Sequence, residues 1–338
     1  MNTVIAFNTH GCLDESQVFE PIRAEFQANS NHIDVKNGGL TVHMFDRLTR
    51  SDGSIEDDID VVMTVTESLS RVFNLGSRQR ISLRKGIERT ISDDAYKCDG
   101  IRAVGKYLRL ENTPTAEGVY DKMYCLFGHN IFRDGDLFIK RGRINVVDMG
   151  HLDGNTQVIV IELVLSYIWR LANAGQLDEF GDIYLFIDEV QNISFASCGM
   201  LSLLLSEGRK YHLNLILATQ LLNYNTTNPT QRKMLQAGLV LYFKPADSDR
   251  AATAAMISEI DKDAWSMELS LLEVGEFVAS GPLLIGDVAT AGPLTIDGRL
   301  NATINRSKKV IIRHNEAVDY EQLRNNLVKH SKEVTENK

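Results

Sequence analysis

Residues Tyr184–Gln191 read YLFIDEVQ, and residues Leu215–Gln220 read LILATQ. The first stretch is an apolar run that ends in two carboxylates, Asp188 and Glu189, and it predicts a buried strand. Open α/β sheets bind their ligands beyond the carboxyl ends of their strands. In nucleotide-hydrolysing folds one such carboxylate holds the water shell of Mg²⁺ and the other polarises the attacking water. The alternative is a buried carboxylate pair that caps a neighbouring helix.

The second stretch ends in Gln220, whose uncharged amide can contact a phosphate or a water beside the carboxylates. A simple hydrogen bond within a loop is the alternative for this side chain. Because the two stretches lie about thirty residues apart, a crossover helix fits between them. Together they favour a site at one edge of a parallel sheet.

From residue 141 onward the sequence alternates between strand and helix patterns. The runs Ile144–Val147, Leu185–Ile187 and Leu215–Leu217 are apolar without alternation, as is typical of strands covered on both faces. An apolar helix is predicted over residues 157–171. The alternation indicates parallel strands joined by crossover helices. The predicted fold class is therefore α/β, with a mostly parallel sheet and flanking helices.

The first 140 residues divide into an α/β start and a helical segment. Residues 1–60 predict a strand, a helix and a strand, and residues 61–140 predict a small helical subdomain or insertion. The expected strands are Val4–Phe7 and Leu40–Phe45, and the expected helices are Ser16–Ala28, one from Val61, Arg80–Ile91, 100–110 and Val119–Phe127.

Between the two stretches quoted first, residues Ser206–His212 read SEGRKYH. An Asp-Glu strand, a helix, this motif and a strand ending in Ala-Thr-Gln resemble, in that order, the HerA/FtsK group of hexameric DNA-pumping P-loop ATPases. That group includes the motors of conjugation and type IV secretion. Further matches are RINVVD at 143–148, the strand Leu239–Phe243, and VGEFVASG at 274–281. The resemblance covers roughly residues 1–300 and is most specific from 141 to 281.

The resemblance implies a RecA-like core that is incomplete at the N-terminus. The core would begin in residues 1–60 and continue over 141–305 with the Walker B and sensor strands. A strand at Lys308–Arg313 and a helix from about Tyr320 would form a tail over 306–338. The implied cofactors are ATP and Mg²⁺: Asp188 would bind the Mg²⁺ shell, Glu189 would polarise the attacking water, and Gln220 would sense the terminal phosphate.

Arg209 matches the arginine that reaches into the nucleotide site of the next subunit in this group. Such an arginine neutralises charge in the transition state. Because it acts on a neighbouring subunit, it requires an oligomer, and the resemblance implies a hexameric ring. Lys210 is a second candidate for this work, and a surface arginine paired with Glu207 is the alternative. Residues Asn223–Pro229 are a candidate pore loop or a surface loop.

The phosphate loop of this group, G-x-x-x-x-G-K-[ST], is not in the sequence. The near match Gly100–Tyr107 follows the polar stretch YKCD rather than a buried strand, and Tyr107 stands where Ser or Thr would reach Mg²⁺. We interpret this near match as a helix with Ile101, Val104 and Leu108 on one face.

The stretch Val4–Gly11 resembles the strand that follows the phosphate-loop helix in this group, with Asn8 where an Asp is usual. The chain is therefore expected to begin just after the missing segment. Truncation, a loop supplied by an upstream chain, and loss of ATP binding all stay open. Losing the segment would also leave backbone groups and an apolar slot of the sheet unpaired.

Two functions follow as hypotheses. The first is an ATP-driven DNA translocase or helicase subunit of HerA type, in DNA processing, conjugation or phage defence. The second is a non-catalytic ring or scaffold subunit that supports a partner nuclease or effector. DNA and further copies of the chain are the expected partners.

Composition sets limits on these hypotheses. The net charge of −9 argues against a surface coated with nucleic-acid-binding groups, although a ring can grip DNA through its pore loops. Four scattered cysteines favour free thiols in a reducing cytoplasm, no zinc spacing is present, and no apolar run is long enough to span a bilayer. A basic cluster predicts either a solvated helix face or a contact with a subunit, DNA or phosphate; it comprises Arg78, Arg80, Arg84, Lys85 and Arg89.

Overall fold

The computed structural model describes residues 2–14, 16–18, 20–133, 135–193, 199–220, 229–234, 237–285, 288–290 and 293–297. The chain divides into two compact units, Met1–Gln236 and Ala237–Lys338. Each unit has its own sheet and its own apolar core. The predicted tail at 306–338 and residues 223–228 of the candidate pore loop lie outside the described residues.

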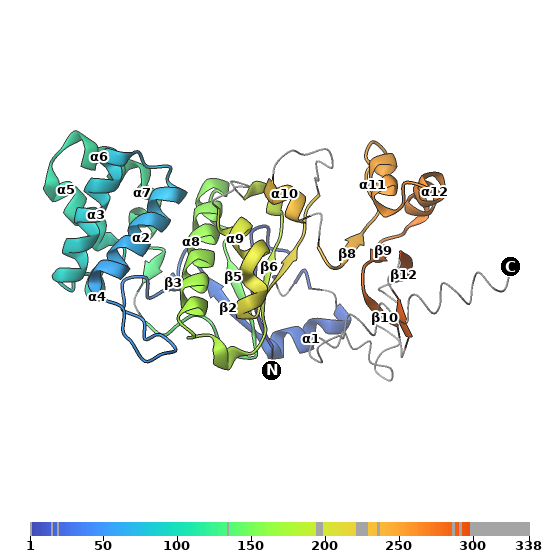
Figure 1. Ribbon diagram of the computed structural model, residues 1–338, viewed down its shortest axis with the longest axis horizontal. Coiled ribbons are helices and arrows are strands. Elements are labelled where there is room, and N and C mark those ends of the chain that lie inside the picture. The colour runs from blue at the N-terminus through green and yellow to red at the C-terminus, as the bar shows by residue number, and fades with distance from the viewer. Residues whose placement is uncertain are drawn as a thin grey trace. The chain divides into compact units, whose positions relative to one another are not determined.

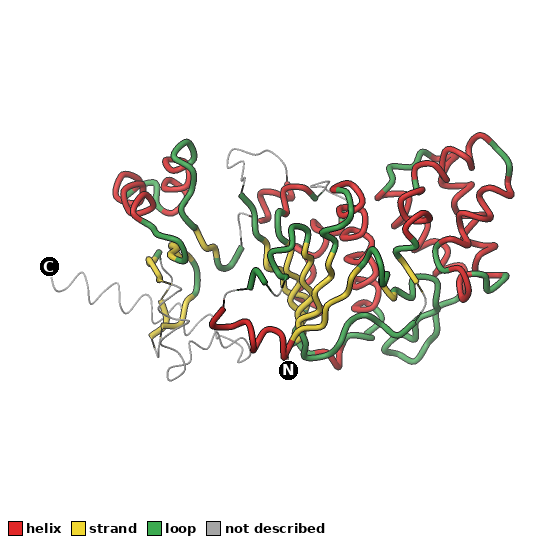
Figure 2. The backbone as a smooth tube through the Cα atoms, turned by 180° about the vertical axis from the view of Figure 1, so that it is seen from behind, coloured by secondary structure: helices red, strands yellow, loops and turns green. Residues whose placement is uncertain are grey.

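The first unit is built on a five-stranded parallel sheet with the strand order β2-β5-β1-β6-β7 (Figure 2). Its inner strands are apolar and buried, because helices and loops cover both faces. The parallel sheet confirms the predicted α/β class. The strands are β1 (Thr3–Asn8), β2 (Ser30–Asp34), β5 (Ile144–Asp148), β6 (Ile183–Ile187) and β7 (Leu213–Leu217).

The long helix α8 (Gly154–Asn173) packs against α2 (Asp58–Val72) and α9 (Met200–Glu207). Its N-terminus is set by Asp153, whose carboxylate accepts hydrogen bonds from the Thr156 N–H and hydroxyl. Most of its faces are buried, which explains its nearly continuous apolar sequence. Shorter helices complete this part of the unit: α1 (Glu20–Asn29), α10 (Pro229–Met234) and the 3₁₀ turns η1 (Asp178–Phe180), η2 (Val190–Asn192) and η3 (Gly208–Tyr211).

A group of six helices follows the first part of the sheet in sequence (Figure 1). Side chains cap two of them, since Asp57 accepts from the Asp60 N–H and Thr113 accepts from the Ala116 N–H. The helices are α2 (Asp58–Val72), α3 (Ser77–Ser92), α4 (Tyr96–Asp99), α5 (Arg102–Glu111), α6 (Pro114–Lys122) and α7 (Tyr124–His129).

Three sequence predictions for the first unit were wrong in detail. The single helix expected at Val119–Phe127 is two helices: α6 ends at Lys122 and α7 begins at Tyr124. The buried Met123 between them continues the apolar pattern across the break. The helix expected from Ser16 begins at Glu20. The strand expected at Leu40–Phe45 is the two-residue β3 (Leu40–Thr41), which pairs with β4 (Phe132–Arg133).

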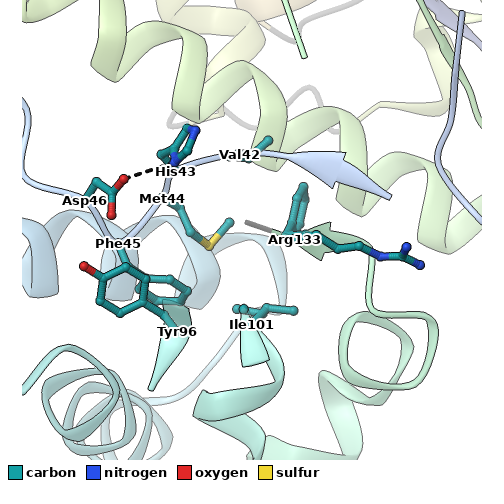
Figure 3. Close-up of a pocket in the computed structure, with 10 residues that line it drawn as sticks. Val42, His43, Met44, Phe45, Asp46, Tyr96, Ile101 and Arg133 are labelled. Atoms are coloured by element: carbon teal, nitrogen blue, oxygen red, sulfur yellow. Dashed lines mark ion pairs between the residues drawn. The ribbon is translucent and has the colours of Figure 1, made fainter. Parts of the chain in front are cut away.

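The rest of that expected strand is a turn whose apolar side chains point into the core. Val42, Met44 and Phe45 are buried, and Phe45 packs against Tyr96 with ring centroids 5.6 Å apart (Figure 3). The cavity that they line with Ile101 measures about 20 Å³, which is room for little more than one water. Burial without backbone pairing therefore gave this segment its strand-like pattern.

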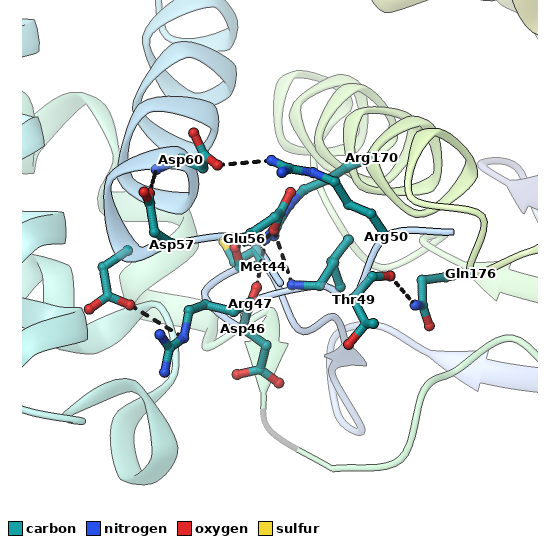
Figure 4. Close-up of polar contacts among 12 residues, drawn as sticks. Met44, Asp46, Arg47, Thr49, Arg50, Glu56, Asp57, Asp60, Arg170 and Gln176 are labelled. Atoms are coloured by element: carbon teal, nitrogen blue, oxygen red, sulfur yellow. Dashed lines mark hydrogen bonds and ion pairs between the residues drawn. The ribbon is translucent and has the colours of Figure 1, made fainter. Parts of the chain in front are cut away.

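A buried ion pair joins the following loop to α8 (Figure 4). Arg170 donates to the carbonyls of Met44 (2.9 Å) and Asp46 (2.6 Å) and forms a hydrogen-bonded ion pair with Glu56. Glu56 also accepts from the Leu48 N–H at 3.1 Å. These bonds fix the course of residues 44–56, whose own regular pairing is limited to an antiparallel bridge between Thr49 and Ile55.

The second unit has an antiparallel sheet in the order β12-β9-β8, packed on helices α11 (Arg250–Ile257) and α12 (Lys262–Leu271). Its core includes Tyr242, Leu269 and Val278. The strand predicted at 239–243 is present as β8, but it pairs with β9 here rather than with the parallel sheet. The strands are β8 (Val240–Tyr242), β9 (Glu276–Ser280), β10 (Leu283–Ile285), β11 (Val288–Thr290) and β12 (Leu294–Asp297).

Candidate functional site

Polar side chains follow four neighbouring strands of the parallel sheet at the point where each strand ends. β5 ends in Asp148 and β1 in Asn8, and these two residues are in register. β6 leads into Asp188 and Glu189, and β7 leads through Thr219 into Gln220. The predicted site residues Asp188, Glu189 and Gln220 are therefore brought to one edge of the sheet.

The backbone turns sharply at Glu189, which adopts a left-handed conformation with φ of 51°. This conformation is uncommon for residues other than glycine. Two bonds hold it: the Glu189 N–H donates to the Asp188 carboxylate (2.9 Å), and the Val190 N–H donates to the Ala218 carbonyl (3.0 Å). The turn separates the directions of the two carboxylates, so that Asp188 and Glu189 have different neighbours.

Glu189 is held from both sides by amide side chains. Gln220 donates to one of its carboxylate oxygens and Gln191 donates to the other. Gln191 is in turn fixed by the Thr219 hydroxyl, which donates to its carbonyl oxygen at 2.6 Å. Gln191 and Thr219 both stand in the two stretches that predicted the site, but their residue types alone do not mark these roles.

Asp188 faces the turn that follows β1. The Cys12 thiol donates to an Asp188 carboxylate oxygen, with 3.7 Å between sulfur and oxygen. Partial burial and then the nearby negative charge of Asp188 raise the pKa of the Cys12 thiol, so it is a neutral donor at neutral pH. Cys12 could not be predicted as a site residue, because a lone cysteine in a loop has no spacing that marks it.

The buried Asn8 organises this turn. Its carbonyl oxygen accepts from the Leu13 N–H (3.2 Å), and its amide donates to Asp14 (3.1 Å) and Asp148 (3.5 Å). An aspartate at position 8 would lose both donated bonds and would face two carboxylates. The asparagine therefore suits a more acidic surrounding than the usual aspartate would.

The site is rich in carboxylates, and the described residues supply no cation that pairs with them. In the described ranges, Asp188, Glu189, Asp148 and Asp14 form no ion pair. Among all the residues that the structure describes, no group of three or more His, Cys, Asp or Glu side chains could hold a metal ion. A single carboxylate is enough for Mg²⁺, which keeps several of its waters when it binds beside phosphates.

Arg209 is not brought to these carboxylates within its own chain. It lies exposed in η3, which precedes β7, whereas Gln220 follows the other end of that strand. A five-residue strand spans about 16 Å. Glu207 pairs with Lys210 at 3.2 Å rather than with Arg209. Arg209 thus lies at the amino end of β7, whereas the carboxylates lie at the carboxyl ends of the strands. Its guanidinium has no ion-pair partner in the described residues.

The near match to a phosphate loop is a helix, as predicted. Residues 102–107 lie in α5, with Ile101, Val104 and Leu108 buried. The added Cβ of a Gly105 substitution would stand 3.0 Å from the Phe127 ring, so packing explains that glycine. Lys106 is exposed and pairs with Asp99. The element directly before this helix is the helix α4 rather than a strand, so the near match lacks the strand that leads into a phosphate loop.

The fold is that of RecA-like α/β proteins. Over 87% of this chain and 80% of that chain, it is similar to VirB4 of Thermoanaerobacter pseudethanolicus, with a TM-score of 0.60 and 15% identity. It is also similar to the plasmid coupling protein TrwB in complex with ADP and Mg²⁺, over 88% of this chain and 85% of that chain, with a TM-score of 0.51 and 12% identity. No family model and no curated protein sequence matches the chain. The resemblance predicted from the motifs is confirmed at the level of fold.

Proposed function

We propose that this chain is a subunit of an ATP-driven DNA translocase or helicase of HerA type, in which Mg²⁺-dependent ATP hydrolysis is coupled to DNA movement. The strongest support for this proposal is the contact between Glu189 and Gln220 beside Asp188, at the carboxyl ends of the strands of a parallel sheet. Parallel α/β sheets bind ligands at this edge. The TrwB structures with ADP and Mg²⁺ and with the GTP analogue GDPNP support nucleotide and Mg²⁺ as ligands.

The residues present fit the hydrolytic half of a nucleotide site. Bound Mg²⁺ would neutralise charge that develops on the phosphates. Asp188 would accept hydrogen bonds from the water shell of Mg²⁺, since its carboxylate has acceptor sites beyond those used by Glu189 and Cys12. Each oxygen of Glu189 accepts one described hydrogen bond and keeps a second lone pair. Glu189 would therefore accept a hydrogen bond from the attacking water and orient it.

Gln220 would act by positioning. Its amide holds Glu189 in one rotamer, and its exposed location at the end of β7 allows it to exchange that bond for a phosphate oxygen. Such an exchange would release Glu189 when the terminal phosphate is present. The contact made by the Gln220 side chain at the end of β7 would in this way depend on whether the terminal phosphate is present.

Arg209 would serve a neighbouring subunit. Its location at the amino end of β7 keeps it from its own Asp188 and Glu189, and its guanidinium is exposed. A trans-acting arginine needs an oligomer, and we propose a hexameric ring that acts on DNA in the cytoplasm, in DNA processing, conjugation or phage defence. In the described part of the chain, no helix combines the length and the apolar character needed to cross a bilayer.

The phosphate-binding half of the site does not fit. The sequence has no G-x-x-x-x-G-K-[ST] loop, and Lys106 of the near match is paired with Asp99 on a helix. This observation favours a second candidate function, a non-catalytic ring or scaffold subunit that supports a partner nuclease or effector. The two candidates differ in whether nucleotide ever binds beside Asp188.

Nucleotide titration tests the proposal. The purified chain is titrated with Mg²⁺ and a fluorescent ATP analogue, alone and with a phosphate-loop segment supplied. A translocase subunit would bind once the loop is present, and DNA would stimulate its hydrolysis of ATP. Glu189→Gln would reduce hydrolysis by about 100-fold or more while binding persists, and the exposed control Glu179→Gln would change neither. Absence of binding in both settings, by a folded chain, would reject the translocase and favour the scaffold.

A further inference from the structure

The helix α12 (Lys262–Leu271), which packs beside α11, has its inward face on the core of the second unit (Figure 1). Leu269 and Leu272 are buried in that core, and Trp265 packs against it. The three residues are four and three positions apart in the sequence, which is the spacing of one helix face. They account for the packing of α12 on its own unit.

A second apolar stripe lies on the outward face of α12 and continues past both ends of the helix. Met267 is 68% exposed and Leu271 is 64% exposed, and Ile260 and Val274 reach 94% and 92%. An apolar residue just before an N-cap often packs against the first turns of its helix. Ile260 stands at that position, before the N-cap Asp261, but its exposure shows that it does not pack there. The α12 stripe consists of Ile260, Ala264, Met267, Leu271 and Val274.

The spacing of the α12 stripe indicates the kind of element that covers it. Its members follow one another at intervals of four, three, four and three residues, the repeat of helices that pack along each other. A helix that is apolar on all sides is normally buried, and a contiguous exposed apolar patch marks an interaction site. The stripe therefore fits a second helix that lies along α12.

The charges beside the α12 stripe select the chemistry of that helix. At about 100° per residue, Asp263 and Glu268 flank the stripe on opposite sides of α12, and neither forms an ion pair in the described residues. Residues 259–273 carry five carboxylates and a single basic residue, Lys262. Such a surface repels DNA and anionic membranes, and it repels the same face of a second copy. A basic helix is the partner that it attracts.

We propose that a basic amphipathic helix of a partner protein docks along the α12 stripe. Apolar residues of this partner, at intervals of three and four, would cover Met267 and Leu271. Its lysine or arginine residues on either side would pair with Asp263 and Glu268. This docking site uses none of the residues around Asp188, so it can exist whether or not nucleotide binds there.

Oxidation of the full chain by hydrogen peroxide, followed by mass spectrometry, tests whether the stripe is open. At low chain concentration Met267 should oxidise about as fast as Met63, which is 54% exposed on α2, and at least about 10-fold faster than the buried Met200. If Met267 is as slow as Met200, the chain covers the stripe itself. If Met267 becomes slow only as the chain concentration rises, a second copy covers it. Either result overturns the proposal.

A designed peptide then serves as the probe for the partner. It has about 15 residues, with leucines at intervals of three and four and lysines on both flanks. At saturation it should slow the oxidation of Met267 by about 10-fold and leave that of Met63 unchanged. A peptide with the same leucines and glutamate flanks should bind at least about 10-fold more weakly. Equal binding of the two peptides would show that the carboxylates do not select the partner, and would overturn a basic helix.

Two substitutions locate the binding surface. Met267→Ser should weaken binding of the lysine peptide by about 10-fold, whereas the matched control Met63→Ser should not change it. Asp263→Lys should weaken the lysine peptide and strengthen the glutamate peptide, a reversal that a loss of structure cannot produce. If Asp263→Lys leaves both affinities unchanged, the peptide binds elsewhere and the proposal is overturned. A folded chain with an open Met267 that binds neither peptide overturns it as well.

Discussion

The side-chain amide of Gln220 donates a hydrogen bond to the Glu189 carboxylate and so joins the ends of two neighbouring strands, β7 and β6. Neither side chain is fully buried. The bond depends on one neutral and one charged partner, because two carboxylates at this separation would repel each other. Its replacement by a carboxylate pair should therefore have a clear dependence on pH.

Gln220→Glu should lower the free energy of unfolding at pH 7 by about 1 kcal/mol, through repulsion between the new carboxylate and Glu189. The repulsion raises the pKa of the pair in the folded state. The loss is therefore present at neutral pH and disappears as the pH falls through the folded-state pKa. Urea unfolding at pH 7 and pH 4 measures both limbs.

Gln220→Ala is the matched control for this substitution. It removes the hydrogen bond without adding charge, and should cost about 0.5–1 kcal/mol with little change between the two pH values. If Gln220→Glu were as stable as the wild type at pH 7, Gln220 would not contact Glu189 in solution.

Replacing the buried Glu162 by glutamine should raise the stability of the folded chain. This residue of α8 is 5% exposed, and one of its carboxylate oxygens has no hydrogen-bond partner. Burial raises the pKa of Glu162, although the Met200 N–H at the start of α9 and the charge of Arg71 act in the opposite direction. The ionised form is thus penalised in the folded protein, and Glu162→Gln should stabilise the chain at pH 7 by about 1 kcal/mol.

The pH dependence of that gain follows from the sign of the shift. Because the folded-state pKa is raised, the penalty is full at pH values above it and vanishes below the unfolded-state pKa, near pH 4. Unfolding in urea at pH 7 and pH 4 should therefore show the gain only at pH 7. The exposed Glu179→Gln should show none, and a loss of stability in Glu162→Gln at pH 7 would mean that the ionised carboxylate is required at the start of α9.

The ion pair of Glu56 and Arg170 should behave in the opposite way. Burial opposes ionisation of Glu56, but the hydrogen bonds from Arg170 and the Leu48 N–H outweigh it, and the net effect lowers the pKa of Glu56. Because the folded-state pKa of Glu56 is lowered, its ionised form stabilises the fold at pH values above the unfolded-state pKa, which is near 4. This stabilisation is lost as the pH falls through the folded-state pKa. Arg170→Met should cost about 3–5 kcal/mol at pH 7, since it leaves a buried, unpaired carboxylate.

The double variant Glu56→Gln/Arg170→Met identifies the source of that cost. It removes both charges, so it should recover a large part of the stability that Arg170→Met loses. Thermal unfolding of the wild type, Glu56→Gln, Arg170→Met and the double variant at pH 7 completes the double-mutant cycle. Additive losses would contradict a direct pair and would assign the cost of Arg170→Met to its bonds with the Met44 and Asp46 carbonyls.

Three strands of the parallel sheet that end in the site could be predicted because their sequences are mostly apolar. Leu185–Ile187 and Leu215–Leu217 are apolar without interruption, Ile144–Val147 is apolar except for Asn145, and the three runs lie in β6, β7 and β5. The carboxylates and Gln220 follow directly from these strands, so their meeting at one edge could be predicted too. β2 was not predicted, because an edge strand that reads SNHID has no apolar pattern to mark it.

The remaining site residues depend on contacts between segments far apart in sequence. Cys12 reaches Asp188 across 176 residues, and only the order of β1 beside β6 brings them together. The fixing of Gln191 by Thr219 depends on the left-handed turn at Glu189, which local propensity does not favour. The motif SEGRKY could be predicted to matter, but the need for its glycine is visible only in the fold.

Gly208 supplies the last prediction. A Cβ at this position would stand 2.9 Å from the Leu213 carbonyl oxygen, which is backbone and cannot move aside as a side chain can. Gly208→Ala should therefore displace η3, which carries Arg209, and cost about 1–3 kcal/mol. Urea unfolding measures the cost, and hydrogen exchange over residues 208–213 should increase in the variant. Gly154→Ala is the control, because a Cβ at the start of α8 meets open space and should leave stability unchanged or slightly raised. Equal stability of Gly208→Ala and the wild type would show that η3 does not approach β7 this closely in solution.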